Sequence, residues 1–397
     1  MNDNVKKMLV LPAALIIQSC LGGIYAWSVF AVAIHDSHGI SMSAAQLVFG
    51  IASAAIPLWT IFASRLCLRI GGRAVTALGG ALFGAGFLLA SFSGEGTALL
   101  YAGIGLLAGA GIGHSYVTPI SASIAWFPTQ KGLVSGVAVA GYGCGAILLA
   151  QIAQHLLASG ADVYGVFRIV GPIYGAVIIL CSFFLFPAPG GRKAEVNTAC
   201  SLAGILKTRE FRLLFSGMFC GTFAGLLVIG NLKPIGLSAG LGPAAATLAV
   251  SFLAAGNATG RVTWGFISDR IQSRAIPISL FCICCTVLLL LLPLSPVAFS
   301  LVSFLIGFSY GGCFVLYAAA SAQVFGASVV SSIYPYIFAA MTASGLAGPW
   351  AGGAIFDLSG SYRWALVISA LTAGAGSSYL LRADNRKCIS CEAQSRC

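Results

Sequence analysis

Long apolar runs, each followed by a few polar residues, recur along the whole chain. Because a helix needs about 20 residues to cross a bilayer, the pattern predicts twelve transmembrane helices. We place them near residues 9–34, 43–67, 74–93, 98–125, 132–158, 165–187, 212–236, 244–267, 275–294, 297–322, 331–357 and 362–382. The predicted fold class is an all-α membrane protein, and the runs leave no gap for a soluble domain of ordinary size.

The longest polar break runs from Pro187 to about Glu210 and separates the sixth predicted helix from the seventh. It divides the chain into an N-terminal six-helix bundle (1–188), a cytoplasmic linker (189–211) and a C-terminal six-helix bundle with a short cytoplasmic tail (212–397). Matching basic segments follow the second and eighth predicted helices: Leu68-Arg69-Ile70-Gly71-Gly72-Arg73 and Asp269-Arg270-Ile271-Gln272-Ser273-Arg274. Such an internal duplication is typical of transporters built from parallel repeats.

Charge supports this topology. Only 8% of the 397 residues are charged and 58% are hydrophobic, whereas soluble domains are about one quarter charged. With both termini cytoplasmic, the opposite side of the membrane receives only Arg168, Lys233 and Arg363 of the Lys and Arg other than Arg261. This positive-inside distribution predicts a multi-pass protein of a bacterial inner (plasma) membrane. It also explains the net charge of +11 without a nucleic-acid partner.

The polar residues do not indicate enzyme chemistry. Most of the thirteen cysteines lie inside apolar runs, where cysteine behaves as a small hydrophobic residue. Cys388, Cys391 and Cys397 in the tail could bind a metal ion or accept a lipid, but a zinc site needs a fourth ligand and no histidine is near. The sequence contains no phosphate-binding Gly-x4-Gly-Lys-Ser/Thr motif. We therefore expect no cofactor, no metal and no enzymatic activity.

One cation, Arg261, lies inside a predicted helix, six residues before its end and roughly 10 Å within the boundary. It either snorkels to the interface or faces a central cavity, where a guanidinium holds a carboxylate through two hydrogen bonds. Ionisable residues inside spans are costly, which favours a functional role, and Asn257 lies one turn away on the same face. The residues therefore point to a carrier of small organic anions.

The chain resembles the major facilitator superfamily, whose loops after helices two and eight carry a Gly-x-x-x-Asp-Arg-x-Gly-Arg motif. Gln272 replaces a motif glycine and Leu68 a motif aspartate. Three stretches resemble the oxalate/formate antiporter family and, more distantly, the monocarboxylate transporters: Gly22-Gly-Ile-Tyr25-Ala-Trp27-Ser-Val-Phe30, Trp126-Phe-Pro128-Thr-Gln-Lys131-Gly-Leu-Val-Ser-Gly136 and Gly256-Asn-Ala-Thr-Gly-Arg261-Val-Thr-Trp-Gly265. The superfamily resemblance implies gating loops formed by Arg69, Arg73, Asp269, Arg270 and Arg274.

The resemblance also implies roles within the site. The antiporter family places its substrate-binding arginine at the position of Arg261. Monocarboxylate transporters carry a proton-coupling aspartate four residues earlier, where this chain has Asn257, and the oxalate transporter pattern adds a lysine in the eleventh helix, at the place of Met341. One formal charge then remains in the pocket. Because an unpaired second substrate charge is costly in a low dielectric, this predicts a monovalent carboxylate.

Aromatic residues fall where the antiporter family lines its cavity: Tyr25, Tyr116, Tyr142, Tyr310 and Phe314. Tyrosine hydroxyls there would complete the hydrogen bonds of a carboxylate, although each residue is equally compatible with ordinary packing. His114 is either a packing histidine or a candidate for proton coupling, being the titratable histidine placed near the cavity.

We therefore expect a secondary transporter of formate-, lactate- or pyruvate-like monocarboxylates, working as a monomer by alternating access in the lipid bilayer. Antiport and cation-coupled uptake both stay open. The alternatives are an exchanger of oxalate or other dicarboxylates and a non-transporting membrane receptor.

Overall fold

The computed structural model describes residues 2–127, 131–188, 202–326 and 330–384, and every regular element in those ranges is a helix. The predicted linker residues 189–201 and the tail cysteines Cys388, Cys391 and Cys397 lie outside the described residues. The all-α prediction is confirmed for the part of the chain that is described.

The first half of the chain forms six membrane-length segments. The first is α1 (Asp3–Gly22), η1 (Gly23–Ala26) and α2 (Trp27–His38), which continue one another. The others are α3 (Met42–Ile70), α4 (Gly72–Ala90), the run α5 (Ala98–Leu100), η2 (Tyr101–Ala108) and α6 (Gly109–Trp126), α7 (Lys131–Ala158) and α8 (Val163–Ser182). We refer to α1–α8 as the N-half.

The second half repeats this plan after the short α9 (Leu202–Leu206). Its segments are α10 (Arg209–Ser238), α11 (Pro243–Ile271), α12 (Ala275–Leu289) after the 3-10 turn η3 (Gln272–Arg274), α13 (Pro296–Phe325), the pair α14 (Val330–Phe338) and α15 (Ala340–Ser359), and α16 (Arg363–Asp384). We refer to α10–α16 as the C-half. The described residues thus contain the twelve predicted segments.

Nine helical stretches of the described residues are long and apolar enough to cross a membrane, and one of them, Pro243–Leu289, contains both α11 and α12. Together with α7 and the α14–α15 pair, these stretches account for the twelve predicted spans. The chain supplies the capping residues that begin several of them. The side chains of Ser41, Asp162, Thr208 and Ser295 accept hydrogen bonds from backbone N–H groups in the first turns of α3, α8, α10 and α13.

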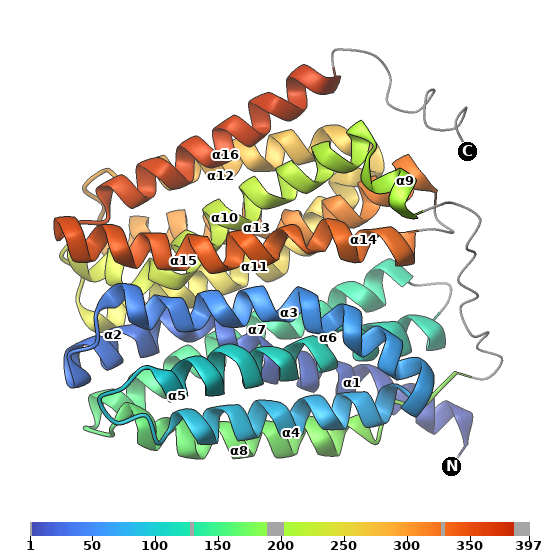
Figure 1. Cartoon of the computed structure of the whole chain (residues 1–397), viewed down its shortest axis with the longest axis horizontal. Helices are drawn as coiled ribbons and strands as arrows, with labels where there is room; N and C mark the ends of the chain where they lie inside the picture. Colours follow the sequence, from blue (N-terminus) through green and yellow to red (C-terminus); the bar gives the residue numbers. More distant parts are fainter. Residues whose placement is uncertain (1, 128–130, 189–201, 327–329, 385–397) are drawn as a thin grey trace.

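The two halves form two layers that lie against each other (Figure 1). They meet mainly along two helix pairs, α3 with α15 and α7 with α11. Both pairs lie in the middle of the molecule, with α4 and α8 on the outer side of one layer and α12 and α16 on the outer side of the other. A central interface between two six-helix bundles results.

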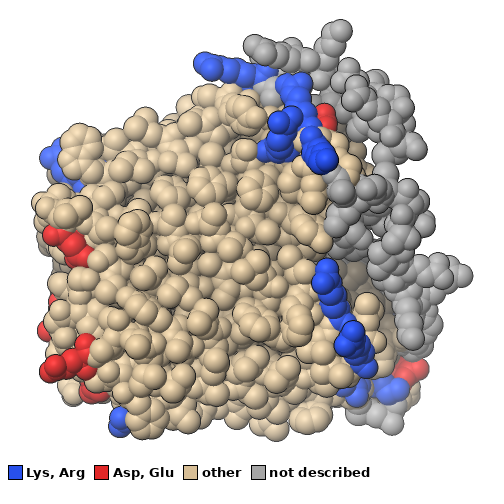
Figure 2. Space-filling model, viewed as in Figure 1, with Lys and Arg blue, Asp and Glu red and all other residues tan. Residues whose placement is uncertain are grey.

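The helix ends define two ends of the molecule. The start of α1 and the end of α16 lie at one end, which we call the terminal end, together with the turns at Gly71 and Gln272 (Figure 1). The turns at Gly39, Gly160, Gly240 and Gly360 lie at the other, which we call the far end. Figure 2 shows most of the visible Lys and Arg side chains toward the terminal end, with acidic side chains at both ends and a few basic ones at the far end.

The structure extends the helix that carries Arg261. Helix α11 continues to Ile271 rather than ending near residue 267. Arg261 therefore lies ten residues before the end of its helix (271 − 261), about 15 Å along the axis. Because this 29-residue helix, about 44 Å long, is longer than a bilayer core of about 30 Å, its end does not mark the membrane boundary, and the depth of Arg261 in the bilayer stays a prediction.

Candidate substrate site

Arg261 lies at the central interface on α11 and is only 5% exposed. A small residue one position earlier allows this placement, because a Cβ at Gly260 would collide with the backbone carbonyl of Phe308 on α13. The close approach of α11 and α13 brings Arg261 beside the aromatic side chains of α13. The prediction that Arg261 and Asn257 share one helix face agrees with their hydrogen bond across one turn.

The guanidinium is held by uncharged groups. Its Nε donates to Asn257 Oδ1 at 2.9 Å, and its Nη1 donates to the hydroxyl of Tyr116 at 3.2 Å. Among the described residues the hydrogen bonds of this side chain leave from Nε and Nη1, so its Nη2 edge is available to a ligand. A planar guanidinium with one open edge can bind a carboxylate.

Aromatic rings surround the guanidinium on several sides. Its Cζ lies 4.8 Å from the ring centroid of Phe314 and 5.7 Å from that of Tyr142, within the range of cation–π attraction. The ring of Tyr142 packs edge-on against Tyr116 and Tyr25, with centroids 5.8 and 5.1 Å away. These rings form an aromatic cage around Arg261, with Tyr116 from α6, Tyr142 from α7 and Tyr25 from η1 on the N-half side and Phe314 on the C-half side.

Tyr25 of the N-half and Tyr310 of the C-half contact each other close to Arg261. Their hydroxyl oxygens lie 3.5 Å apart, and the ring of Tyr310 packs edge-on against Phe314 at 5.4 Å. Both tyrosines are buried. Six predicted residues thus lie around Arg261. They are Tyr25, Tyr116 and Tyr142 of the N-half and Asn257, Tyr310 and Phe314 of the C-half.

Within the described part of the chain, Arg261 forms no ion pair with an acidic side chain. The ion pairs between described residues are Lys6–Asp3 and His38–Asp162, both near helix ends, and no described Asp or Glu side chain is buried. A second polar group beside the guanidinium is also unsatisfied: Asn257, 1% exposed, has a buried Nδ2 without a hydrogen-bond partner. Because buried donors are normally paired, both groups are candidate ligand-binding groups.

A family model described as Major Facilitator Superfamily matches residues 13–349. This chain belongs to the Major Facilitator Superfamily. The oxalate:formate antiporter of Oxalobacter formigenes is 30% identical over 377 residues, which cover 92% of this chain and 88% of that protein. An uncharacterized MFS-type transporter of Escherichia coli is 29% identical over 342 residues, 84% of each chain. Monocarboxylate transporter 12 of Xenopus laevis is 26% identical over 327 residues, 74% of this chain and 70% of that one.

Solved structures agree on the fold. A bacterial homolog to the human lysosomal transporter Spinster, in an inward-facing and occupied conformation, superposes with a TM-score of 0.70 over 95% of this chain and 96% of that one, at 16% identity. The unoccupied inward-facing form of that homolog gives a TM-score of 0.68 at 17% identity. At this identity the likeness shows the major facilitator fold and nothing further about the ligand.

The superfamily's basic segments lie at the terminal end, as predicted. Arg69 is exposed in the last turn of α3, and Asp269 and Arg270 are exposed at the end of α11. Arg73 instead binds within its own half, donating from Nε to the carbonyl of Leu185 at 3.0 Å and lying over the ring of Phe186. The gating role of these residues stays a prediction.

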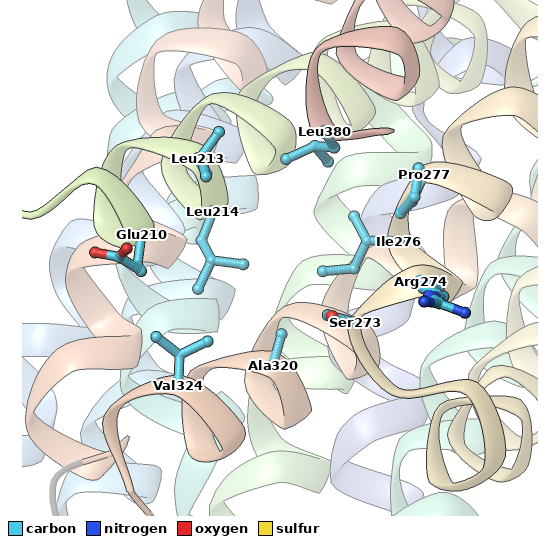
Figure 3. A pocket seen from close by; sticks show the side chains of 10 residues that line it. All are labelled: Glu210, Leu213, Leu214, Ser273, Arg274, Ile276, Pro277, Ala320, Val324 and Leu380. Carbon is cyan, nitrogen blue, oxygen red and sulfur yellow. The ribbon is translucent and has the colours of Figure 1, made fainter. Parts of the chain in front are cut away.

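Arg274 lines a small, mainly apolar pocket inside the terminal end of the C-half (Figure 3). Glu210 and Leu214 of α10 lie on one side, and Pro277 of α12 lies across from them beside Arg274. Val324 of α13 forms part of the rim. None of the residues around Arg261 lines this pocket, so it is separate from the central site.

Two predicted residues lie further from the guanidinium. Met341 is buried near the start of α15, one turn beyond Phe338, whose ring packs on Phe314 with centroids 6.0 Å apart. His114 is buried within the N-half, where Nδ1 lies 2.8 Å from the carbonyl oxygen of Ala110 and its ring packs against Trp59. This is a packing environment, and the role of His114 in proton coupling stays a prediction.

Sequence reasoning missed one member of the cage. The hydroxyl of Tyr334 on α14 donates to the carbonyl of Phe314 at 3.1 Å, and its ring stacks on Phe338 at 6.0 Å. Tyr334 lies within electrostatic range of both Arg261 and Tyr116. The available signal was the segment Tyr334-Pro335-Tyr336 inside an apolar run, where a proline in a span indicates an irregular helix.

The prediction of a single cation within the spans was wrong. Lys233 was counted among the cations on the side opposite the termini, near the end of the predicted helix 212–236, yet α10 continues to Ser238 and the Lys233 side chain is only 4% exposed. Its Nζ donates to Oε1 of Gln154 on α7 at 2.7 Å. A contact with the other half of the molecule therefore buries a lysine that the charge count placed on the side of the membrane opposite the termini.

Proposed function

We propose that this chain is a secondary transporter of small monocarboxylates, of the formate, lactate and pyruvate class. The observation that carries the proposal is the buried Arg261 guanidinium, which is held only by neutral groups and keeps one edge open. Burying a cation without a counter-ion is costly. A substrate carboxylate supplies that counter-ion.

The surroundings favour a carboxylate over a larger anion. Arg261, the free Nδ2 of Asn257 and the hydroxyl of Tyr116 offer several donors within one turn of α11 and the facing α6. Phe314 and Tyr142 enclose them with apolar ring surface. A planar, two-oxygen anion with a small or absent apolar tail fits these contacts.

The charge of the site favours a monoanion. Among the described residues around the guanidinium there is no second cation, and the place where the antiporter pattern has lysine is Met341. The other buried cation among the described residues, Lys233, lies near the far end. Because the Oxalobacter formigenes relative is an oxalate:formate antiporter, dicarboxylate exchange is the alternative to be measured.

The arrangement of the halves supports alternating access. Among the described residues, hydrogen bonds between the halves include Tyr25–Tyr310 and Arg261–Tyr116 at the centre and, toward the far end, bonds made by Gln154, Gln46 and Asp357. Rocking of the two bundles would break the far-end contacts and expose Arg261 to that side. Both antiport and cation-coupled uptake are compatible with this motion.

Counterflow in proteoliposomes tests the proposal. Wild type, Arg261→Gln and the control Arg168→Gln would be loaded with formate, lactate, pyruvate or oxalate and assayed with each labelled compound. Arg168 is a suitable control because it is a cation that bonds only within the N-half, to Ser91. A lost charge-assisted hydrogen bond costs about 1.5–3 kcal/mol, so Arg261→Gln should weaken uptake by about 10- to 100-fold.

Equal uptake by wild type and Arg261→Gln would contradict the assignment of Arg261. Absence of uptake of all four compounds by wild type would indicate another substrate class or the receptor alternative. Preference for oxalate over the monocarboxylates would favour the dicarboxylate exchanger.

A further inference from the structure

Lys233 is a buried cation at the interface of the two halves, away from the Arg261 site. It belongs to the C-half, and its hydrogen-bond acceptor, Gln154 Oε1, belongs to the N-half at 2.7 Å. The same oxygen accepts a hydrogen bond from Thr247 Oγ1 of α11 at 2.9 Å. One amide oxygen of the N-half therefore holds two donors of the C-half.

The ammonium group lacks an acidic partner within the described residues, since no carboxylate oxygen lies within 4.0 Å of Nζ. The nearest acidic influence comes from Asp36, an exposed residue at the end of α2 that acts at longer range. A lysine ammonium can donate three hydrogen bonds. Its one bond here, to an amide oxygen, leaves the group able to exchange that acceptor for a stronger, anionic one.

Two independent measurements along helices show that Lys233 and Arg261 lie at different positions along the length of the interface between the halves. On α11, Thr247 at the lysine level and Arg261 are separated by 14 residues, about 21 Å along the axis. On α7, Gln154 at the lysine level and Tyr142 beside Arg261 are separated by 12 residues, about 18 Å. Both helices line the contact between the halves, so the two cations mark the far-end mouth and the centre.

We propose that Lys233 is a second anion-recognition residue, located at the far-end mouth of the transport path. While that end is closed, Gln154 holds the ammonium group. When the halves separate there, Lys233 moves with the C-half and Gln154 with the N-half, so the ammonium exchanges the amide oxygen for the carboxylate of an incoming monocarboxylate. The anion then passes inward to Arg261. This inference rests on the proposed function, because it assumes a carboxylate substrate.

Sided transport measurements test this role. Proteoliposomes with one verified orientation would be assayed for initial uptake of whichever of formate, lactate and pyruvate is carried fastest, supplied from the far-end side or from the terminal side. For Lys233→Gln we expect the far-end KM to rise about tenfold, with the terminal-side KM changed less than twofold. Arg363→Gln removes another far-end cation, at the exposed start of α16, and serves as the matched control.

Charge itself is tested in the folded wild type and in Lys233→Arg. The arginine variant should retain the far-end KM of wild type within about threefold, and the wild-type far-end KM should rise with ionic strength more steeply than the terminal-side KM. An unchanged far-end KM in Lys233→Gln, or equal increases on both sides, would overturn the proposal. If Lys233→Gln does not fold, equal salt dependence on the two sides of wild type would overturn it.

The two proposals fail in different ways. If the Arg261 assignment is wrong, wild type and Arg261→Gln will have the same KM on both sides of the membrane. If only the Lys233 assignment is wrong, Arg261→Gln will still differ from wild type, but Lys233→Gln will not raise the far-end KM more than the terminal-side KM.

Discussion

Neutral partners keep the charge of Arg261 available to a ligand. Asn257 Oδ1 orients the guanidinium from 2.9 Å without neutralising it. A carboxylate at this position would form an internal ion pair instead, and that pair would compete with a substrate anion for the same cation. A neutral residue at position 257 therefore leaves the positive charge of Arg261 unpaired, whereas an acidic residue there would neutralise it.

The first prediction follows from this geometry. In Asn257→Asp, the new carboxylate should bind Arg261 and raise the KM for the monocarboxylate about tenfold or more at neutral pH. Protonation of the aspartate removes the competing charge, so uptake should recover as the pH falls. The measurement is the KM across a pH series, with Asn257→Ala as the control that lacks the carboxylate. A pH dependence identical to that of wild type would count against this role.

The second prediction concerns Met341. It is buried one turn from Phe338, which packs on the Phe314 ring beneath Arg261. In Met341→Lys, a second cation should accommodate the second carboxylate of oxalate and increase its affinity by about tenfold or more. Competition of labelled formate uptake by oxalate measures this, with Met341→Gln as the uncharged control. Unchanged oxalate inhibition in the lysine variant would remove Met341 from the site.

The third prediction concerns backbone conformation at Gln272. This residue has φ 53° and ψ −135°, the one positive φ of a non-glycine residue in the described ranges. Gly71 holds the equivalent place in the N-half with φ 82°. Because side chains disfavour this region, Gln272→Gly should increase stability by about 1 kcal/mol, seen as a higher Tm in detergent. Gly71→Gln is the converse variant and should lower the Tm; a shift of both in the same direction would contradict this reasoning.

The sequence predicted contacts between residues that a motif spaces along one helix. It did not predict contacts that depend on packing between segments far apart in the chain. Arg261 and Asn257 are one turn apart on α11, so their contact follows from helix geometry. Lys233 is buried by Gln154, 79 residues away in the chain, and Tyr334 reaches the cage because of the bend between α14 and α15. Neither arrangement is visible in a hydropathy pattern.

At the scale of elements, helix α3 and helix α15 are joined at the far end by one carboxylate. Asp357 of α15 accepts hydrogen bonds from the backbone N–H groups of Met42 at 3.1 Å and Ser43 at 2.8 Å. These are among the first N–H groups of α3, which have no partner within their own helix. A negative charge there is also favoured by the helix dipole. The contact links the C-half to the N-half.

The fourth prediction is that Asp357→Asn opens the far end more often. Charge–dipole contacts of this kind contribute about 0.3–1 kcal/mol, enough to shift a conformational ratio by roughly two- to fivefold. Spin labels at the exposed positions Ser37 and Ser359 would report longer distances between the halves. Asp162→Asn is the control, because it removes a far-end carboxylate that binds His38 within the N-half. Equal distance changes in both variants would rule out a specific role for Asp357.

The elements themselves were largely predictable. Apolar length located the twelve segments, and capping residues such as Ser41 and Thr208 begin helices close to the expected positions. The irregular segments were not predicted: η1 at Gly23–Ala26, the π-helical η2 at Tyr101–Ala108 and the break at Ala339. Their local sequences are as apolar as those of the regular helices, so a hydropathy pattern does not distinguish them.

At the scale of the whole molecule, charge separates the two ends. Most of the described Lys and Arg lie at the terminal end, including Arg65, Arg69, Lys207, Arg270 and Arg382, where Asp3, Glu210 and Asp269 also lie. The far end carries Asp36, Glu95, Asp162 and Asp357 with the cations Arg168 and Arg363, and Figure 2 shows the basic side chains gathered toward the terminal end. Because positively charged loops are retained in the cytoplasm, this polarity favours a cytoplasmic terminal end. The far-end mouth with Lys233 would then open to the outside of the cell.

The fifth prediction makes this orientation measurable. In a variant without native cysteines, Gly96→Cys at the far end and Lys207→Cys at the terminal end introduce single exposed thiols. A Cβ at Gly96 meets only ordinary contact distances, and Lys207 lies in a turn, so neither change disturbs packing. A membrane-impermeant maleimide added to intact cells should label residue 96 and not residue 207, and permeabilisation should make both reactive. The reverse pattern would place Lys233 at the cytoplasmic mouth, so that its effect on KM would have to appear for export rather than for uptake.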